Sequence, residues 1–348
     1  MPSPLVECVP NISEGRNLEI INKIVDAVRA VDGCTVLGVE PDHDYNRTVI
    51  TFAGAPETVE EGAIALILAS VEALDMRQHT GEHPRMGVVD VCPFVPLRDV
   101  SMEACAEMAR RVVERVTSTI PVPMYLYGAA ASSSERSMLS TLRKGEYEGL
   151  QARFSDAESV HPEVTRWPDA GPKVWGEEIA RTGAITVGAR PILVAYNVNL
   201  EERDGRVSKM VGSIVRSSGR LLKSESGSSV RSQGMLPKVQ GMGVALEEMG
   251  ISQVSMNLLD VDLCPLHLAF KTCESLARDH GVNVCGSEIV GLAPLQAMLA
   301  AGRFFEPDED DETTLVYVAV EKLGLNAHHH FDPNIHVIEW ALKQEENV

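Results

Sequence analysis

The stretch HTGEHPRMGVVDVCPF, residues 79–94, places an irregular polar loop directly before an apolar, β-branched run. Gly81 is a weak helix former, and Pro84 disfavours helical backbone at the residue before it. The run Val88–Cys92 that follows predicts a strand. Because functional groups are usually presented on loops held by a rigid scaffold, this segment is the first candidate for a site.

Around this strand, the first half of the chain alternates strand-like and helix-like patterns. Apolar residues at helical spacing predict helices over 18–31, 56–74 and 102–117. Apolar and β-branched runs predict strands over 5–9, 35–39, 48–52 and 122–127. The resulting β-α-β-β-α-β order is that of a split βαβ, ferredoxin-like unit.

The second half restarts the same kind of pattern after a turn-rich stretch over 155–188, which predicts a surface connector. Strands are predicted over 192–200, 239–246, 252–258 and 282–284, helices over 207–217 and 265–280, and a flexible surface loop over 224–233. We therefore expect an α+β protein of two ferredoxin-like α/β lobes, residues 1–180 and 181–348. Each lobe is expected to have a mixed sheet with helices on one face.

Composition limits the classes of function. The chain has 348 residues, 44% of them hydrophobic, and a formal net charge of −19. Such an acidic surface disfavours nucleic acid or an anionic membrane as a partner. The acidic run 306–312 predicts a solvated loop, and the apolar runs are too short to span a bilayer. The first residues lack the basic and apolar regions typical of a secretory signal, and the seven cysteines are scattered without a Cys-x-x-Cys pair. We therefore expect a cytoplasmic protein in a reducing compartment.

Two alternative chemistries are weaker. His79 and His83, with Glu82 between them, superficially resemble a zinc motif, but Gly81 and Pro84 disfavour the continuous helix that it requires. We therefore expect no metal. Cys92 is expected to be a buried core thiol. The histidines at 328–330 and 336 carry a weak metal signal and predict a surface turn before a strand.

His83 fits an acid/base role better. The ordinary pKa of histidine, about 6.5, allows a proton to be accepted and returned near neutral pH. Glu82 or Asp90 is placed to fix the tautomer of the ring, and Arg85 to hold an anionic substrate.

Further polar groups support a site for an anion. Arg47, Arg143 and Arg190 each lie in a turn of this otherwise acidic chain. Asn197 and Asn199 alternate with apolar residues in a predicted strand, so both are expected on one side of it.

Taken together, these motifs resemble the formiminotransferase family over nearly the whole chain. The motifs that carry the resemblance are LVECVPNISEGRN (5–17), NRTV (46–49), GEHPRMG (81–87), DVCPF (90–94), RKGEYE (143–148), GAR (188–190), VSMNL (254–258) and GSEIVGL (286–292). In the bifunctional vertebrate members this module precedes a cyclodeaminase module, whose activity is not expected here.

The resemblance implies two α/β lobes with a folate-binding tunnel between them, in a cytoplasmic homodimer. It implies transfer of a formimidoyl group between N-formimidoyl-L-glutamate and tetrahydrofolate, the co-substrate, in histidine degradation. His83 matches the catalytic histidine, and Glu40 matches an acidic position that is Asp in vertebrates. With Asp90, these form the expected catalytic set.

The substrate and folate contacts expected alongside them are Arg47, Arg85, Arg143, Gly171, Pro172, Arg190, Asn197 and Asn257. Two alternatives stay open: a folate-dependent formyltransferase acting to or from glutamate, and a folate-binding protein without catalysis.

Overall fold

The chain divides into two compact units, residues 1–191 and 192–348. The computed structural model describes residues 3–81, 84–155, 161–223 and 229–345. The expected boundary after residue 180 is eleven residues too early. The end of the predicted connector, residues 185–189, is a strand that pairs with two strands of the first sheet, so it belongs to the first unit.

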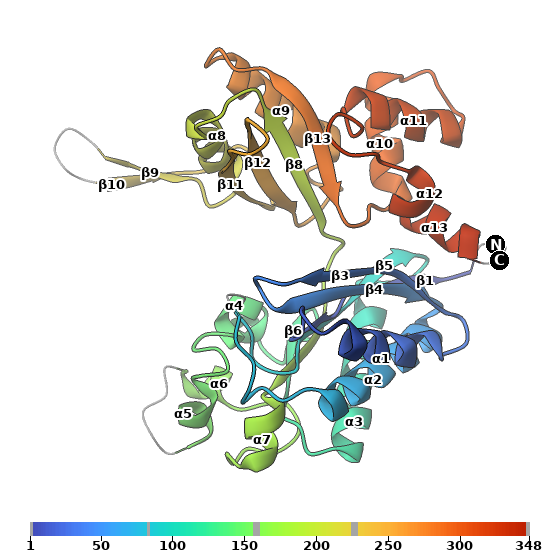
Figure 1. Cartoon of the computed structure of the whole chain (residues 1–348), viewed down its shortest axis with the longest axis vertical. Coiled ribbons are helices and arrows are strands. Elements are labelled where there is room, and N and C mark those ends of the chain that lie inside the picture. The colour runs from blue at the N-terminus through green and yellow to red at the C-terminus, as the bar shows by residue number, and fades with distance from the viewer. Residues whose placement is uncertain (1–2, 82–83, 156–160, 224–228, 346–348) are drawn as a thin grey trace. The chain divides into compact units, whose positions relative to one another are not determined.

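Apart from the two-residue strand β2, the first unit begins with the predicted β-α-β-β-α-β order, and it continues with a third long helix and further strands (Figure 1). Its strands are β1 (Leu5–Cys8), β2 (Asn11–Ile12), β3 (Cys34–Asp42), β4 (Arg47–Gly54), β5 (Val89–Arg98), β6 (Met124–Gly128) and β7 (Ile185–Ala189). Its helices are α1 (Leu18–Arg29), α2 (Pro56–Ala73), α3 (Met102–Thr119), the 3₁₀ turn η1 (Ser134–Arg136), α4 (Leu139–Leu142), α5 (Leu150–Phe154), α6 (Glu163–Arg166) and α7 (Glu177–Thr182).

The first sheet is mixed, as expected. Strands β3, β4, β1 and β5 lie in that order and pair antiparallel, while β7 adds parallel to β5 and β6 adds parallel to β7. Helices α1, α2 and α3 cover one face (Figure 1). The helical spacing read in the sequence is the cause, since Ile21, Ile24, Val25 and Val28 of α1 are all buried.

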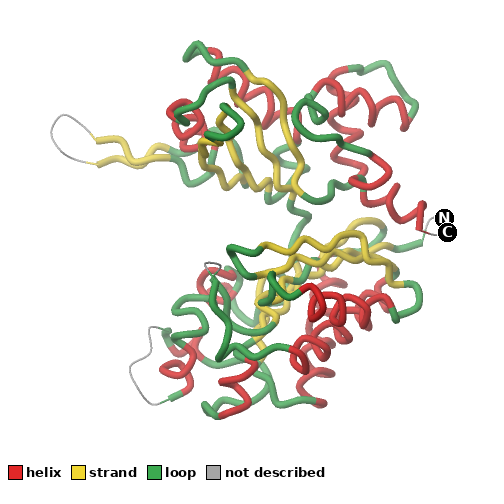
Figure 2. The backbone as a smooth tube through the Cα atoms, in the orientation of Figure 1, coloured by secondary structure: helices red, strands yellow, loops and turns green. Residues whose placement is uncertain are grey.

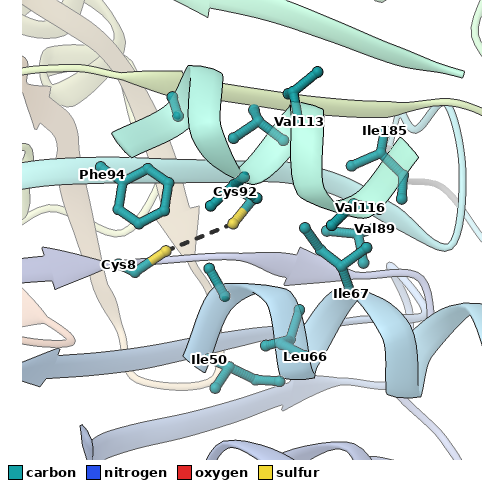
Figure 3. Packing of buried hydrophobic residues seen from close by; sticks show 14 of the residues in the cluster. Cys8, Ile50, Leu66, Ile67, Val89, Cys92, Phe94, Val113, Val116 and Ile185 are labelled. Carbon is teal, nitrogen blue, oxygen red and sulfur yellow. Dashed lines mark hydrogen bonds between the residues drawn. The ribbon is translucent and has the colours of Figure 1, made fainter. Parts of the chain in front are cut away.

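Cys8 and Cys92 lie in the core beneath these helices, and Figure 3 shows them facing each other. Their sulfur atoms are 3.6 Å apart, and both side chains are fully buried. Burial raises the pKa of the Cys8 thiol well above its ordinary value. The expectation that Cys92 is a core thiol is confirmed, and all seven cysteines are free.

The second unit repeats the strand order of the first. Its strands are β8 (Val194–Leu200), β9 (Arg220–Lys223), β10 (Ser229–Ser232), β11 (Val239–Leu246), β12 (Ile251–Leu258) and β13 (Val284–Val290). Its helices are α8 (Arg206–Val215), α9 (Leu266–Arg278), α10 (Leu295–Phe305), α11 (Glu312–Lys322), α12 (Pro333–His336) and α13 (Ile338–Glu345).

The four strands β11-β12-β8-β13 pair antiparallel throughout, so the expected mixed sheet is wrong for this unit. The reason is that no strand equivalent to β6 or β7 extends this sheet in the described residues. The element order β8-α8-β11-β12-α9-β13 is nevertheless the ferredoxin-like order again. The α+β class is therefore confirmed.

Two smaller expectations are wrong. The segment expected as a loop over 224–233 contains strand β10, which pairs with β9 in a separate two-stranded sheet. The histidines at 328–330 precede helix α12 rather than a strand, because Asp332 accepts a hydrogen bond from Asn334 N and Pro333 occupies the first turn. Figure 2 shows the connections as loops between these elements. In the described ranges, no helix is long and apolar enough to cross a membrane.

Candidate active site

The loop that carries the sequence signal begins with a histidine held by the β3–β4 turn. The Nε2 atom of His79 lies 2.8 Å from the carbonyl oxygen of Asn46. The side-chain amide of Asn46 donates to the carbonyl oxygen of Thr80 at 2.8 Å and accepts from Gly15 N at 2.9 Å. Asn46 has a φ of 49°, a left-handed backbone that asparagine tolerates better than most residues. This one turn residue therefore fixes the first part of the loop.

The other end of the loop is held by Arg85, which is buried. Its two Nη atoms donate to the carboxylate of Glu148 at 2.8 and 2.7 Å, and its Nε donates to His79 Nδ1 at 3.2 Å. The ion pair holds the pKa of Glu148 below its ordinary value. Tyr147 N also donates to the carbonyl oxygen of Arg85 at 2.8 Å. The two ends of the loop thus meet through the contact between Arg85 and His79.

These contacts assign the tautomer and the protonation state of His79. Because Nδ1 accepts from a guanidinium, it carries no proton, and Nε2 is left to donate to the carbonyl of Asn46. Burial, and secondarily the charge of Arg85, lowers the pKa of His79 and so favours this neutral form. His79 therefore supports the loop rather than serving as a second proton shuttle.

Asp90, on β5, secures the residue that follows the loop. Its carboxylate accepts from Met86 N at 3.1 Å and from Arg143 Nη2 at 2.5 Å, and it is 1% exposed. Burial raises the pKa of Asp90, although the charges of Arg143 and Arg47 oppose that shift. The contacts show a carboxylate that holds backbone and an arginine in place.

His83, the expected catalytic residue, and Glu82 lie outside the described residues. Their role stays a prediction, and the structure contributes the frame on each side of them. That frame consists of His79, Asn46, Arg85, Glu148 and Asp90, all in the first unit.

Two further expected residues lie on the neighbouring strands. Arg47, at the start of β4, donates to Asn11 Oδ1 at 3.2 Å, and its guanidinium lies 5.7 Å from the centre of the Tyr45 ring. Glu40 is exposed near the end of strand β3, opposite Val49 in the register. A cavity of about 360 Å³ opens beside the start of the loop and is lined by His79, Asn46 and Glu14, among others.

The connector residues have clear backbone roles. Gly171 has a φ of 85°, and a Cβ atom there would lie 2.1 Å from the carbonyl oxygen of Val122, so only glycine fits. Pro172 follows it and is half-buried. Arg190 N donates to the carbonyl oxygen of Phe94, which ties the end of β7 to β5.

In the second unit, the expected residues share one face of the sheet. Asn197 pairs with Ser255 and Glu288 across the neighbouring strands, and its amide donates to Glu288 Oε2 at 3.4 Å. Asn257 lies two residues beyond Ser255 and so has the same orientation. Asn199 is on this face as well and is 1% exposed, and its Oδ1 has no hydrogen-bond partner among the described residues. The expected shared side of Asn197 and Asn199 is confirmed.

Sequence reasoning assigned no role to Asn46 or Glu148, although both lie in motifs that carry the family resemblance. Their signal was indirect. Asn46 is a residue type that tolerates a left-handed turn position better than most, and Glu148 is one of two glutamates in the motif RKGEYE. Within the described ranges, no group of three or more metal-ligating side chains lies close enough to hold an ion.

Comparison with known proteins agrees with this division of the chain. A family description, "Formiminotransferase domain, N-terminal subdomain", matches residues 5–190, and "Formiminotransferase domain" matches residues 195–343. These ranges meet at the boundary between the two units.

Similar proteins carry related names. The formimidoyltransferase-cyclodeaminase of Dictyostelium discoideum is 39% identical, and the match covers 99% of this chain but only 61% of that protein. The glutamate formimidoyltransferase of Streptococcus pyogenes serotype M1 is 36% identical over 88% of this chain and 94% of its own length. The glutamate formimidoyltransferase of Thermoplasma acidophilum is 38% identical over 86% of this chain and 92% of its own length. The chain belongs to the formiminotransferase family.

Proposed function

We propose that this chain is a glutamate formimidoyltransferase. It would transfer the formimidoyl group between N-formimidoyl-L-glutamate and tetrahydrofolate, giving 5-formimidoyltetrahydrofolate and L-glutamate, as a step of histidine degradation. Two relatives named glutamate formimidoyltransferase match along more than nine-tenths of their own lengths, which supports the proposal. We further propose that the protein acts in the cytoplasm as a homodimer.

In this mechanism His83 moves the proton. Nitrogen N5 of tetrahydrofolate bonds to the formimidoyl carbon, and the tetrahedral intermediate breaks its bond to the glutamate nitrogen. His83 accepts the proton from the attacking nitrogen and returns it to the leaving amine, so no net proton is consumed. A histidine that is neutral near pH 7 can perform both transfers.

The observation that carries this proposal is the frame around His83. On one side, His79 and Thr80 are held by Asn46, and on the other, Arg85 and Met86 are held by Glu148 and Asp90. An acid/base group needs a fixed position relative to the reacting atoms, since misplacement by about 1 Å can cost a hundredfold in rate. A loop braced on both sides meets that need.

The arginines divide into two groups under this proposal. Arg85 and Arg143 already pair with Glu148 and Asp90, so they act as positioning residues. Arg47 and Arg190, each in a turn of this acidic chain, stay the candidates for binding the glutamate carboxylates of the substrate and of the folate. Glu40 as a proton relay, and Gly171, Pro172, Asn197 and Asn257 as folate contacts, stay proposals.

The experiment is a direct transfer assay with purified protein, tetrahydrofolate and N-formimidoyl-L-glutamate. Replacement of His83 by Ala should lower turnover by at least about a hundredfold, which is the lower range for loss of an acid/base group, while folate binding by calorimetry is retained. His330→Ala, at an exposed histidine of the second unit, is the matched control and should leave turnover unchanged. Equal turnover in the two variants would remove His83 from the mechanism.

The same assay separates the alternatives. N-formyl-L-glutamate offered in place of the formimidoyl donor tests whether the chain is a formyltransferase. Folate binding without turnover on either donor would favour a binding protein without catalysis.

A further inference from the structure

The hairpin β9–β10 forms a two-stranded sheet of its own in the second unit. Figure 1 shows it extending away from the helices and the main sheet of that unit. Leu222 pairs with Val230 across the ribbon, and Leu221 pairs with Arg231 on its opposite face. The arm extends from the end of α8, and its base is fixed where Arg231 Nη1 donates to the carbonyl oxygen of Ser218 at 2.9 Å.

This hairpin exposes apolar side chains on both faces. Leu221 is 61% exposed, Leu222 45% and Val230 62%. An isolated two-stranded hairpin is only marginally stable in water, because it has no third strand or helix against which to bury apolar area. Its two open edges also leave backbone groups available for another chain. Covering the ribbon would therefore stabilise it.

The charges on the arm restrict what can cover it. Arg220 and Arg231 lie on the ribbon and Arg216 at its base, in a chain whose net charge is −19. None of these three guanidinium groups makes an ion pair with a carboxylate of the described residues. The arm is thus an apolar surface flanked by positive charges. Its complement is an apolar surface flanked by negative charges.

Such a surface lies on the same unit, over α11, α12 and α13. A cavity of about 290 Å³ there is lined by Glu312, Tyr317, Trp340 and Lys343, among others, and the Tyr317 and Trp340 ring centres are 6.4 Å apart. The acidic run 306–312 leads directly into α11, and its carboxylates are mostly exposed. Figure 1 shows α11 and the hairpin at opposite ends of the second unit, so the arm does not reach its own groove.

We propose that the β9–β10 hairpin is an association arm that binds the groove of α11–α13 on a second copy of this chain. Leu222 and Val230 pack against Tyr317 and Trp340, while Arg220 and Arg231 face the acidic run. A mutual exchange of arms between two copies gives a closed two-fold dimer, in which each copy contributes one arm and one groove. This inference does not depend on the proposed reaction.

The test is the solution mass of the full-length protein, by sedimentation velocity and light scattering. The chain has a mass of 37.8 kDa, and the wild type is expected at twice that value. The double variant L222D/V230D should raise the dimer dissociation constant at least tenfold. V174D places one such charge at an exposed apolar residue of the first unit and should leave the dimer intact. A monomeric wild type, or a dimer unchanged by L222D/V230D, would overturn the proposal.

Two charge-reversal variants, one on the arm and one on the acidic run, distinguish loss of the contact from misfolding of the arm. R220E/R231E and D308K/D310K should each be monomeric alone, with the circular dichroism and melting temperature of the folded chain. One variant with reversed charges on both surfaces, R220E/R231E/D308K/D310K, should dimerise again. Failure of that combined variant to recover the dimer, while it remains folded, would show that the arm and the groove do not meet.

Discussion

The first unit buries charged groups, whereas the second buries only neutral polar side chains among the described residues. Buried in the first are Glu7, Glu60, Arg85, Asp90, Arg136 and Arg153. Buried in the second are Asn197, Asn199, Ser208, Ser252 and Ser287. Both units share the ferredoxin-like strand order, so the scaffold does not require this difference. Burying a charged side chain costs free energy unless it is paired. The buried charges therefore mark the first unit as the one in which ion pairs hold side chains and loops in position.

The largest expected effect is at the buried pair of Asp90 and Arg143. Asp90→Ala leaves the guanidinium of Arg143 without its carboxylate and Met86 N without its acceptor. Breaking a buried pair on one side costs about 3–5 kcal/mol, so we expect the free energy of unfolding in urea to fall by about 3 kcal/mol. Asp262→Ala, at an exposed carboxylate of the second unit, should change it by less than about 0.5 kcal/mol. A loss below about 1 kcal/mol for Asp90→Ala would contradict the comparison.

The next effect is on turnover, through the brace of the loop. Glu148→Gln keeps the size of the side chain but removes the charge that faces Arg85. We expect kcat to fall about tenfold with little change in KM, because His83 is positioned less firmly while the binding groups stay in place. Glu148→Asp should recover part of kcat by restoring the charge.

Glu163→Gln provides the matched control, at an exposed glutamate of the same unit. A rise in KM without a fall in kcat for Glu148→Gln would instead make Glu148 part of the substrate-binding surface. Equal kcat values for Glu148→Gln and Glu163→Gln would show that the loop needs no such brace.

Sequence patterns predicted most of the two repeated units, because each main helix and strand has a clear apolar period. They failed at β7, since residues 185–189 are buried on both sides and lie in a turn-rich region with no alternation to mark a strand. They also failed at β10, where serine and glycine composition suggested a flexible loop and only pairing with β9 defines the strand.

For the site, the sequence indicated the loop but not its internal pairing. Arg85 was expected to hold a substrate anion, yet its guanidinium is paired with Glu148, which lies 63 positions along the chain. Which carboxylate reaches a given arginine depends on the three-dimensional approach of distant segments. Residue types and local spacing do not contain that information.

A third prediction concerns pH and again separates the units. Burial, and then the charge of Arg153, lowers the pKa of His161 to about 4 in the folded first unit. The unfolded chain therefore binds this proton near pH 6.5 and the folded chain does not, so stability is retained above about pH 6.5 and is lost as the pH falls toward 4. One such proton contributes at most about 1.4 kcal/mol per pH unit.

His161→Gln should therefore flatten the decline in unfolding free energy between pH 6.5 and 5, measured by urea titration at several pH values. His330→Gln, at an exposed histidine of the second unit, should leave the slope as in the wild type. Parallel curves for His161→Gln and the wild type would show that this ring titrates normally.

The smallest expected effect is in the neutral core of the second unit. The hydroxyl of Tyr196 donates to Ser287 Oγ at 2.9 Å, and Ser287 donates onward to the carbonyl oxygen of Leu323. Tyr196→Phe removes one neutral hydrogen bond while Ser287 keeps its acceptor, so the free energy of unfolding should fall by about 1 kcal/mol. Turnover should not change, because no charge moves and no loop of the first unit is touched. A loss of unfolding free energy as large as that of Asp90→Ala would show that neutral hydrogen bonds stabilise the second unit as strongly as ion pairs stabilise the first. The two units would then differ in the charge of their buried groups but not in how much those groups stabilise the fold.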